Sequence, residues 1–264
     1  MNIQYIYYKS IDSTNNEIKR RLASDELPTE FTVVSAGTQT AGRGRIGHEW
    51  SSPEGSSVAT SMVLYPKGLP EDCVPQLTIV AAMAVAYAIE ALYGLPAQIK
   101  WTNDILLSEK KVCGILTERI NEAVVVGIGV NVYGGSFPPE LAERATCIAD
   151  ELSRIGESRE KPPKVNAHET ELSRNDLTKK IWGGFLALYE KFLEKKNLSF
   201  LVKEYNSRLI NAGRTVRILD PSGAYEARAV EMDEDGKLVV ETDKGQIVRI
   251  DSGEVHIRGQ NGYV

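Results

Sequence analysis

A glycine-rich segment near the start of the chain carries the residues best suited to bind an anion. It reads Gly42-Arg43-Gly44-Arg45-Ile46-Gly47, and Trp50 follows it. Glycines let backbone N–H groups approach an anion, arginines offer forked donors to phosphate or carboxylate oxygens, and an indole ring gives a base a face to stack on. The segment predicts a phosphate or carboxylate site, although the loop alone fits two solvated arginines equally well.

The same segment matches the letters of the dinucleotide-binding pattern GxGxxG, which is a weak signal by itself. The pattern is specific where the third glycine opens a helix and an acidic residue follows about 20 positions later. Here the next residues include Ser51-Ser52-Pro53-Glu54-Gly55, which favours a turn, and position 67 is a lysine. We therefore do not expect a Rossmann domain.

Three further segments combine cations, amides and glycines. Lys100-Trp101-Thr102-Asn103-Asp104 places a cation, an amide and a carboxylate at the end of a predicted strand. Lys110-Lys111-Val112-Cys113-Gly114-Ile115-Leu116 has a glycine where a ligand could lie close, and Gly127-Ile128-Gly129-Val130-Asn131 has two glycines on one strand face. Taken singly, each is explained as well by a turn or by packing, and Ser13-Thr14-Asn15 by a helix N-cap.

Charge and composition exclude several classes of protein. The chain has 264 residues and a formal net charge of −5, which disfavours binding to duplex DNA phosphates. The three cysteines are far apart and form no disulfide framework or metal pair, and the three histidines are too scattered for zinc. The longest nearly apolar run, 77–89, is shorter than the roughly 18–20 residues that span a bilayer. We expect a cytoplasmic globular protein that binds neither nucleic acid nor membrane.

The hydrophobic pattern predicts the elements that must position these residues. In the first 150 residues it predicts helices from Asp12 and over 77–92, and strands at 31–36, 57–64, 99–101, 105–107, 112–118 and 123–132. Consecutive strands with short connections favour a mixed or antiparallel sheet with helices on one side, which is an α+β fold. Apolar residues at spacings of three and four predict another helix from Asn175.

The last part of the chain changes to short strands. Five runs, at 215–219, 226–232, 237–241, 246–250 and 254–257, are separated by turn residues and predict a small SH3-like or OB-like barrel. This part is more acidic than basic, which is unusual for an OB surface that binds nucleic acid. We expect one domain at 1–210, with a polar, proline-broken insertion at about 151–175, and a second domain at 211–264.

Taken together and in this order, the motifs resemble those of biotin–protein ligases (biotin–[acetyl-CoA-carboxylase] ligases). The resemblance covers residues 1 to about 150, and the small barrel fits the family's SH3-like C-terminal domain. Each matching segment is a weak signal, but their combination is specific. The segments are Ser13-Thr14-Asn15, Gln39-Thr40-Ala41-Gly42-Arg43-Gly44-Arg45, Trp50-Ser51-Ser52-Pro53-Glu54-Gly55, Lys100-Trp101-Thr102-Asn103-Asp104, Lys111-Val112-Cys113-Gly114-Ile115-Leu116 and Gly127-Ile128-Gly129-Val130-Asn131.

The resemblance implies an activity and partners. Members of the family use ATP to convert biotin to biotinyl-5'-AMP with release of pyrophosphate. They then transfer biotin to one lysine of a biotin carboxyl carrier domain of a biotin-dependent carboxylase. The resemblance also implies a class II synthetase-like catalytic domain, Mg²⁺ held mainly by the ATP phosphates, no bound organic cofactor, and a homodimer.

The resemblance assigns roles to particular residues. The catalytic set is Lys111, Arg43, Arg45 and Asp104. The biotin-binding set is Ser13, Thr14, Asn15, Gln39, Gly42, Arg43, Gly44, Arg45, Lys111, Gly114 and Gly127. The set that binds ATP and the adenylate is Arg43, Arg45, Trp50, Asn103, Lys111 and Asn131.

The chain departs from the family pattern at a few positions. Thr102 stands where the motif usually has proline, and Cys113 stands where alanine is common. Ile46 and His48 occupy positions that are often basic. The missing positive charge at these two positions puts in doubt how firmly the loop closes over the intermediate.

Two other functions fit part of the pattern. A lipoate–protein ligase or lipoyl transferase has a related fold and related acyl-transfer chemistry, but the glycine–arginine loop and the segment from Lys100 to Asp104 favour biotin. Some ligases of the family also repress transcription through an N-terminal winged helix. About 12 residues precede Ser13, whereas a small domain takes roughly 50 or more, so we expect a monofunctional ligase.

Overall fold

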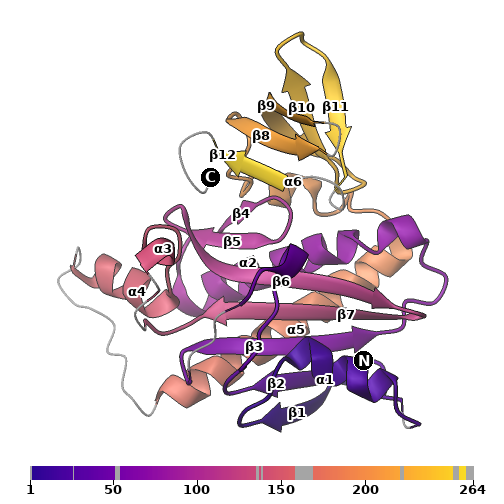
Figure 1. Cartoon of the computed structure of the whole chain (residues 1–264), viewed down its shortest axis with the longest axis vertical. Helices are drawn as coiled ribbons and strands as arrows, with labels where there is room; N and C mark the ends of the chain where they lie inside the picture. The colour runs from indigo at the N-terminus through magenta and orange to yellow at the C-terminus, as the bar shows by residue number, and fades with distance from the viewer. Residues whose placement is uncertain are drawn as a thin grey trace.

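The computed structural model describes residues 2–25, 27–50, 54–134, 137, 139–157, 169–220, 223–251 and 256–259. Its main layer is a seven-stranded sheet in the order β1-β2-β3-β7-β6-β5-β4 (Figure 1). The strands are β1 (Gln4–Tyr8), β2 (Thr32–Ala36), β3 (Ser57–Leu64), β4 (Gln98–Lys100), β5 (Asp104–Leu107), β6 (Lys110–Ile120) and β7 (Ala123–Asn131). β1 runs parallel to β2, and the other neighbouring pairs are antiparallel.

The sequence patterns locate six of these strands to within two residues at each end. They missed β1, whose residues Gln4-Tyr5-Ile6-Tyr7-Tyr8 show no alternation of apolar and polar side chains. This strand forms one edge of the sheet, and Tyr5 and Tyr7 are exposed there. Ile6 and Tyr8, on the other face, are half-buried against the core that contains Ile18. Because both faces carry large apolar or aromatic side chains, the residue types show no period-two pattern.

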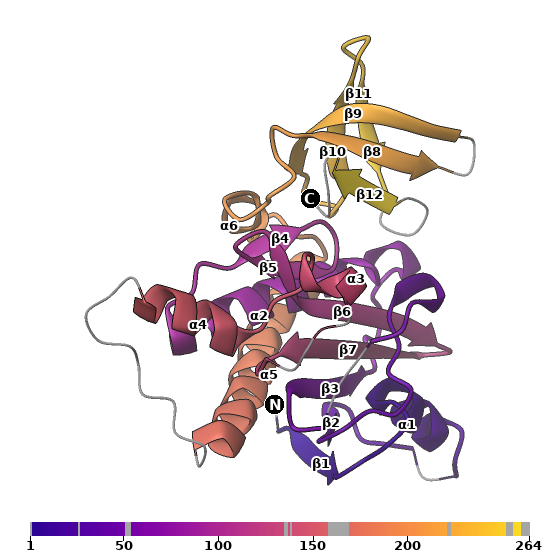
Figure 2. The ribbon, with the colours of Figure 1, turned by 60° about the vertical axis from the view of Figure 1, so that its left-hand side comes forward.

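Two long helices cover one face of the sheet, as expected. They are α2 (Gln76–Tyr93) and α5 (Glu169–Lys195), which pack against each other (Figures 1 and 2). Helix α2 covers β4 to β7, and α5 covers β3. The indole nitrogen of Trp182 in α5 donates a hydrogen bond of 3.0 Å to the hydroxyl of Thr60 in β3. The segment Glu71–Tyr93 is long and apolar enough to cross a membrane, but 83% of its apolar window is buried inside the protein, as in a core helix.

Helix α1 (Thr14–Leu22) is an exception to the expectation that helices lie on one side. Its buried Ile18 packs with Val34, Val63 and Val125, whereas the neighbouring strand residue Met62 belongs to the core under α2 and α5. Because successive strand residues point to opposite faces, α1 lies on the face that the long helices leave uncovered. That face also holds the candidate site residues described below.

The structure has helices in part of the region where a polar insertion was expected, 151–175. Helix α3 (Pro139–Ala142) precedes it, α4 (Ile148–Glu157) enters it, and α5 begins at Glu169, six residues earlier than predicted. Residues 158–168 lie outside the described part of the chain. Ile148, Leu152 and Ile155 of α4 stand at spacings of four and three and pack against the core. Helix α4 was missed because this stripe has only three apolar residues and most of the residues around it are polar.

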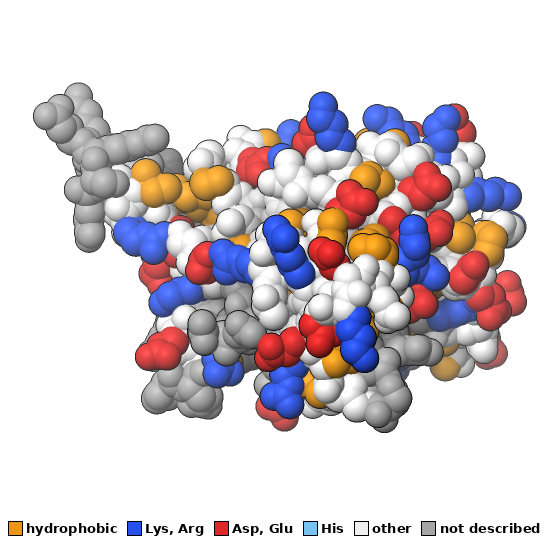
Figure 3. All heavy atoms as spheres, turned by 90° about the horizontal axis from the view of Figure 1, so that it is seen from above, with side chains coloured by type: hydrophobic (Ala, Val, Ile, Leu, Met, Phe, Trp, Pro, Cys, Tyr) orange, Lys and Arg blue, Asp and Glu red, His pale blue; other side chains and the backbone are white. Residues whose placement is uncertain are grey.

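The C-terminal strands form a separate antiparallel sheet in the order β11-β10-β9-β8-β12, at one end of the molecule (Figure 1). They are β8 (Thr215–Asp220), β9 (Gly223–Met232), β10 (Leu238–Thr242), β11 (Ile247–Ile250) and β12 (His256–Gly259), reached through α6 (Val202–Asn206). All five predicted strands are present. Seen from above, the described residues of this face carry interspersed acidic and basic side chains without a continuous basic surface (Figure 3).

One tryptophan joins the two sheets. The backbone N–H of Trp101 donates to the side-chain carbonyl of Asn211 at 2.9 Å, and its indole nitrogen donates to the backbone carbonyl of Gly236 at 2.9 Å. Gly236 sits in the β9–β10 turn with φ of 79°. A Cβ atom at this glycine would lie 2.6 Å from Cδ1 of Ile79 in α2, so the turn is in close contact with the helical core.

This contact predicts that Gly236→Ala destabilises the protein more than Gly245→Ala does. Both glycines have positive φ in turns of the small sheet, but a Cβ at Gly245 meets nothing within 4 Å. Each alanine costs about 1 kcal/mol of left-handed strain. Only Gly236→Ala adds overpacking of about 1–3 kcal/mol against the fully buried Ile79. Urea unfolding measures both, and equal losses would contradict the close contact.

Candidate functional site

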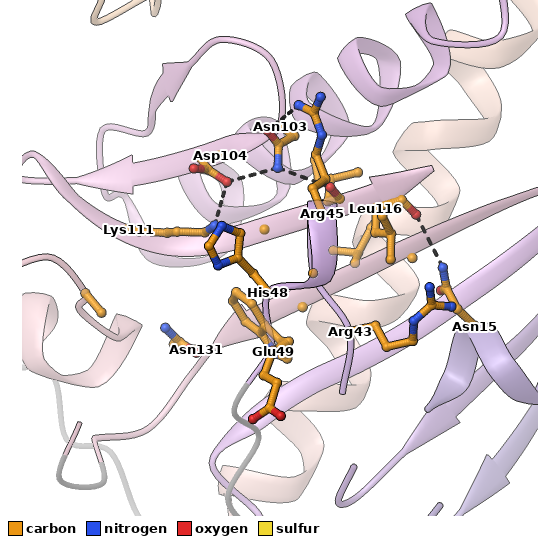
Figure 4. A pocket seen from close by; sticks show the side chains of 18 of the residues that line it. Asn15, Arg43, Arg45, His48, Glu49, Asn103, Asp104, Lys111, Leu116 and Asn131 are labelled. Carbon is orange, nitrogen blue, oxygen red and sulfur yellow. Dashed lines mark hydrogen bonds and ion pairs between the residues drawn. The ribbon is translucent and has the colours of Figure 1, made fainter. Parts of the chain in front are cut away.

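The predicted site residues gather around one cavity of about 460 Å³ on the sheet face that carries α1 (Figure 4). The glycine loop, the start of α1, the β4–β5 connection and strands β6 and β7 form its wall. Gly42 is the one predicted residue that does not line it; the others are Ser13, Thr14, Asn15, Gln39, Arg43, Gly44, Arg45, Trp50, Asn103, Asp104, Lys111, Gly114, Gly127 and Asn131.

Gly42 acts on the shape of the loop instead. Its carbonyl accepts a hydrogen bond of 2.9 Å from the backbone N–H of Trp50. A Cβ atom here would overlap the carbonyl oxygen of Trp50, so a larger residue would push the two ends of the loop apart. The 3₁₀ turn η1 (Arg45–Gly47) lies between them. In the described residues no α-helix follows the loop before Gln76, which confirms that this is not a Rossmann fingerprint.

One end of the cavity is a buried cluster of neutral hydrogen-bonding groups. Ser13 is the N-cap of α1, but its side chain makes no capping bond. Gln39 fills that role, because its Oε1 accepts from the backbone N–H of Thr14 at 2.8 Å and from its hydroxyl at 3.0 Å. Asn15 beside them is 4% exposed, and its Oδ1 lies 2.5 Å from the hydroxyl of Ser61 in β3.

The other end of the cavity is charged. Nζ of Lys111 lies 2.7 Å from Oδ1 of Asp104, which also accepts from Nδ2 of Asn103 at 3.2 Å. A terminal nitrogen of Arg45 donates to Oδ1 of Asn103 at 3.1 Å. Burial lowers the pKa of Arg45, partly offset by the Asp104 carboxylate, but an arginine remains fully charged at neutral pH. Two cations are therefore fixed around one carboxylate and one amide.

The indole ring of Trp50 lies over two glycines of strands β6 and β7. A Cβ at Gly129 would overlap the ring of Trp50, and one at Gly114 would lie 3.0 Å from it. Gly114 and Gly129 are paired in the β6–β7 register. The amino group of Lys111 lies 5.7 Å from the ring centroid, which is within reach of a cation–π interaction.

Two buried polar atoms at the cavity have no hydrogen-bond partner among the described residues. They are Nε1 of Trp50 and the hydroxyl of Thr102, and both residues line the cavity. Buried donors and hydroxyls in folded proteins are nearly always paired with protein, water or ligand. The cavity therefore offers a ligand two unpaired polar groups as well as charged ones.

The two arginines of the loop, which the sequence places two residues apart, point to opposite ends of the cavity (Figure 4). Arg45 reaches Asn103, as described. Arg43 lies beside Asn15: it donates to Oδ1 of Asn16 at 3.2 Å and lies 3.3 Å from Oε1 of Glu118 in β6. In this conformation Arg43 is bonded away from the Asp104–Lys111 pair.

A short segment before α4 holds the charged end in place and was not predicted to take part. The backbone N–H of Lys111 donates to the carbonyl of Arg144 at 2.8 Å, and the N–H of Thr146 donates to the carbonyl of Lys111 at 2.9 Å. Nδ2 of Asn131 donates to the carbonyl of Thr146 at 3.1 Å. The buried carboxylate of Glu151 accepts from the Thr146 hydroxyl at 2.7 Å. Only the long-range fold brings these residues together, so no local motif signalled them.

The described residues contain no group of three or more His, Cys, Asp or Glu side chains that could hold a metal ion. The carboxylate of Asp104, which belongs to the charged end, is bonded to Lys111 and Asn103.

Comparison with known proteins identifies the family of this chain. The model of the Biotin/lipoate A/B protein ligase family matches residues 7–133, and that of the Biotin protein ligase C terminal domain matches residues 212–258. The bifunctional ligase/repressor BirA of Bacillus subtilis is 32% identical over 96% of this chain and 74% of its own length. The biotin–[acetyl-CoA-carboxylase] ligase of Mycobacterium tuberculosis is 28% identical, over 93% and 86%.

A solved structure extends the likeness to the fold. Biotin protein ligase from Aquifex aeolicus in complex with biotin and ATP superposes with a TM-score of 0.78 and 31% identity, over 97% of this chain and 99% of that chain. The chain belongs to the biotin/lipoate A/B protein ligase family. Within the family, its C-terminal match and its relatives place it with the ATP-dependent biotin–protein ligases rather than with the lipoate ligases.

The cysteines are not candidates for a covalent acyl intermediate. Cys113 lies between two cavity-lining segments, but it is fully buried, and burial raises its pKa well above the usual range. Burial also raises the pKa of Cys73, and that of Cys147 to about 12. A thiol with so high a pKa carries almost no thiolate at neutral pH and is a poor nucleophile.

This burial predicts that the native protein reacts slowly with a thiol reagent such as DTNB at pH 8. All three thiols should react only after unfolding in guanidinium, since exposure restores an ordinary pKa near 8.5. Absorbance of the released thiolate counts them in each state. A thiol that reacts within seconds in the folded protein would contradict the described burial.

Proposed function

We propose that the cavity carries out both half-reactions of biotin–protein ligation, with biotin at the neutral end and ATP at the charged end. The observation that carries this proposal is the placement of Arg45 and Lys111 around Asp104 and Asn103, between a buried hydrogen-bonding cluster and an indole ring. A carboxylate from one side and an α-phosphate from the other would meet at these two cations.

The neutral end suits the fused rings of biotin. A cyclic urea has a carbonyl that accepts and N–H groups that donate, and the hydroxyls and amides of Ser13, Thr14, Asn15 and Gln39 supply both kinds of partner. Gly127 on the opposite strand has no side chain, so Asn15 lies directly against the sheet there. The bicyclic ring would enter beside this glycine, and its valeryl chain would extend toward Lys111.

The charged end suits the nucleotide. Adenine would stack on Trp50, which is already held over Gly129, and its edge would face Asn131. Two anions near 4 Å apart repel by several kcal/mol at an effective dielectric of about 20. Arg45 and Lys111 would offset this repulsion, because their positions are fixed before the substrates arrive.

The first half-reaction joins biotin to AMP. A carboxylate oxygen of biotin attacks the α-phosphorus of ATP, a new P–O bond forms, and the bond to pyrophosphate breaks. Mg²⁺ would accompany ATP on the phosphate oxygens. The loop from Gly42 to Trp50 would cover the mixed anhydride and keep water away.

The second half-reaction moves biotin to a carrier lysine. The lysine amine attacks the acyl carbon, an amide bond forms, AMP leaves, and the amine loses a proton. A lysine has an ordinary pKa of about 10.4 and must be deprotonated to react, whereas a carboxylate is a weak base. We therefore assign Asp104 the task of orienting Lys111 and the incoming amine, with no requirement that it act as the base.

Several wider features complete the proposal. The partner is the carrier domain of a biotin-dependent carboxylase, and the enzyme is a cytoplasmic homodimer that binds neither nucleic acid nor membrane. Catalysis resides in residues 1–210, and residues 211–264 form an SH3-like domain. The five-stranded antiparallel sheet supports the assignment of an SH3-like domain. The mixed surface charge seen in Figure 3 supports the proposal that the protein does not bind nucleic acid.

The activity is tested by incubating the protein with ATP, Mg²⁺, a carrier domain and either biotin or lipoate. We expect mass spectrometry to show biotin on one carrier lysine and little or no lipoyl product. Lys111→Ala should lower adenylate formation at least about 100-fold, as expected for the loss of a preorganised charge, with little change in melting temperature. Preference for lipoate would overturn the choice of substrate, and full activity of Lys111→Ala would overturn its role.

The two glycines of β7 predict a separation of substrate effects. Gly127→Ala would displace Asn15 and should raise KM for biotin about 10-fold or more, because an overlap of this kind costs about 1–3 kcal/mol. Gly129→Ala would displace Trp50 and should raise KM for ATP by a similar factor. Initial rates at varied biotin and varied ATP distinguish the two, and each variant is the control for the other. The opposite pattern would reverse the assigned ends.

A further inference from the structure

Glu118 lies close to the neutral end of the cavity and has three partners there. It is on the same face of β6 as Gly114 and Leu116, and its carboxylate is largely buried, with 18% of the side chain exposed. Oε2 accepts from Nδ2 of Asn15 at 2.8 Å. Oε1 lies 2.8 Å from Nζ of Lys19 and 3.3 Å from Arg43.

These partners come from three parts of the chain. Asn15 and Lys19 belong to one face of α1, and Arg43 belongs to the glycine loop. The carboxylate thus connects strand β6, helix α1 and the loop that lies over the cavity. Burial opposes the charge of Glu118, but the hydrogen bonds from Lys19 and Asn15, together with the charge of Arg43, lower its pKa below the usual range. At neutral pH the group is an anion, and each partner gives it a donor.

We propose that Glu118 is a positioning residue that orients Asn15 for biotin and holds the glycine loop over it through Arg43. The proposal rests on the proposed function, because it assigns biotin to this end. Glu118 itself does not line the cavity, so it acts through its two neighbours and not by touching the substrate.

The orientation of the Asn15 amide follows from its fixed partners. Its nitrogen donates to the Glu118 carboxylate at 2.8 Å and, over a longer 3.5 Å, to the backbone carbonyl of Leu116, and its oxygen faces the hydroxyl of Ser61. A flipped amide would point its oxygen at a carboxylate, which accepts hydrogen bonds but has none to give. A neutral glutamine at position 118 could donate as well as accept, so only the longer contact with the Leu116 carbonyl would still disfavour the flipped orientation of Asn15.

The position of Arg43 follows from the same charge. Glu118 is the acidic partner of Arg43 in the described structure, and Asn16 is its second contact. With the carboxylate removed, Arg43 would keep only a neutral acceptor, and the part of the loop over the neutral end would lose its charged side-chain anchor. The contacts of Arg45 with Asn103, and of Lys111 with Asp104, do not involve Glu118. Loss of Glu118 should therefore affect biotin and leave ATP almost unchanged.

The test compares Glu118→Gln with wild type and with Glu122→Gln. Glu122 follows β6 in the same hairpin, is exposed, and does not line this cavity. Calorimetry with biotin alone should show about 10-fold weaker binding for Glu118→Gln, and steady-state rates should show KM for biotin raised by a similar factor. KM for ATP should stay within about twofold, and Glu122→Gln should match wild type.

A second comparison separates positioning from simple stabilisation. Arg43→Gln in the Glu118→Gln background should weaken biotin binding less than it does in wild type, because directly interacting residues are not additive. A lower melting temperature for Glu118→Gln with unchanged biotin affinity would show a purely structural role and overturn the proposal. Equal increases in both KM values would overturn it too. A wild-type protein that binds no biotin would instead overturn the proposed function.

Discussion

The site depends on a stretch of sheet that has almost no side chains. Gly114, Gly127 and Gly129 lie on one face of the β6–β7 pair, so the indole of Trp50 and the amide of Asn15 rest directly on the strands. A Cβ atom at any of these positions would contact one of those two groups. Buried strands usually fill such positions with branched side chains. The cavity exists because these strands leave them empty and because the long helices α2 and α5 supply the core from the other face.

The remaining features fix charges at the rim of this hollow. Arg45, Lys111 and Asp104 surround the centre, while Arg43, Lys19 and Glu118 form a second group beside the neutral end. Each cation has a counter-charge or an amide partner, which keeps the partly buried groups stable in the absence of substrate. Binding of two anionic substrates would be favoured by the cations that face the cavity, and the second group keeps the loop in register.

Much of this arrangement is readable from the sequence, for physical reasons. Strands β3 and β7 are buried and rich in branched residues, so their limits are clear, and the glycine, lysine and amide positions mark the site. Strand β1 has large apolar or aromatic side chains on both faces and gave no pattern. Glu118 could not be found because its partners are 75 to 103 residues away along the chain, and a lone glutamate in a strand resembles any solvated side chain. The opposite directions of Arg43 and Arg45 depend on the backbone path of the loop, which the residue types alone do not determine.

Trp101 gives the small sheet a mechanical link to the centre of the molecule. Its two hydrogen bonds hold Asn211 and Gly236, and three residues later the same segment supplies Asp104. The regions that match the two family models, 7–133 and 212–258, are therefore separate in the sequence but in direct contact in the folded protein. A C-terminal domain exchanged from a relative would need a turn that accepts this indole and an amide in the place of Asn211. The two regions are consecutive along the chain, but in the folded protein they depend on each other through Trp101.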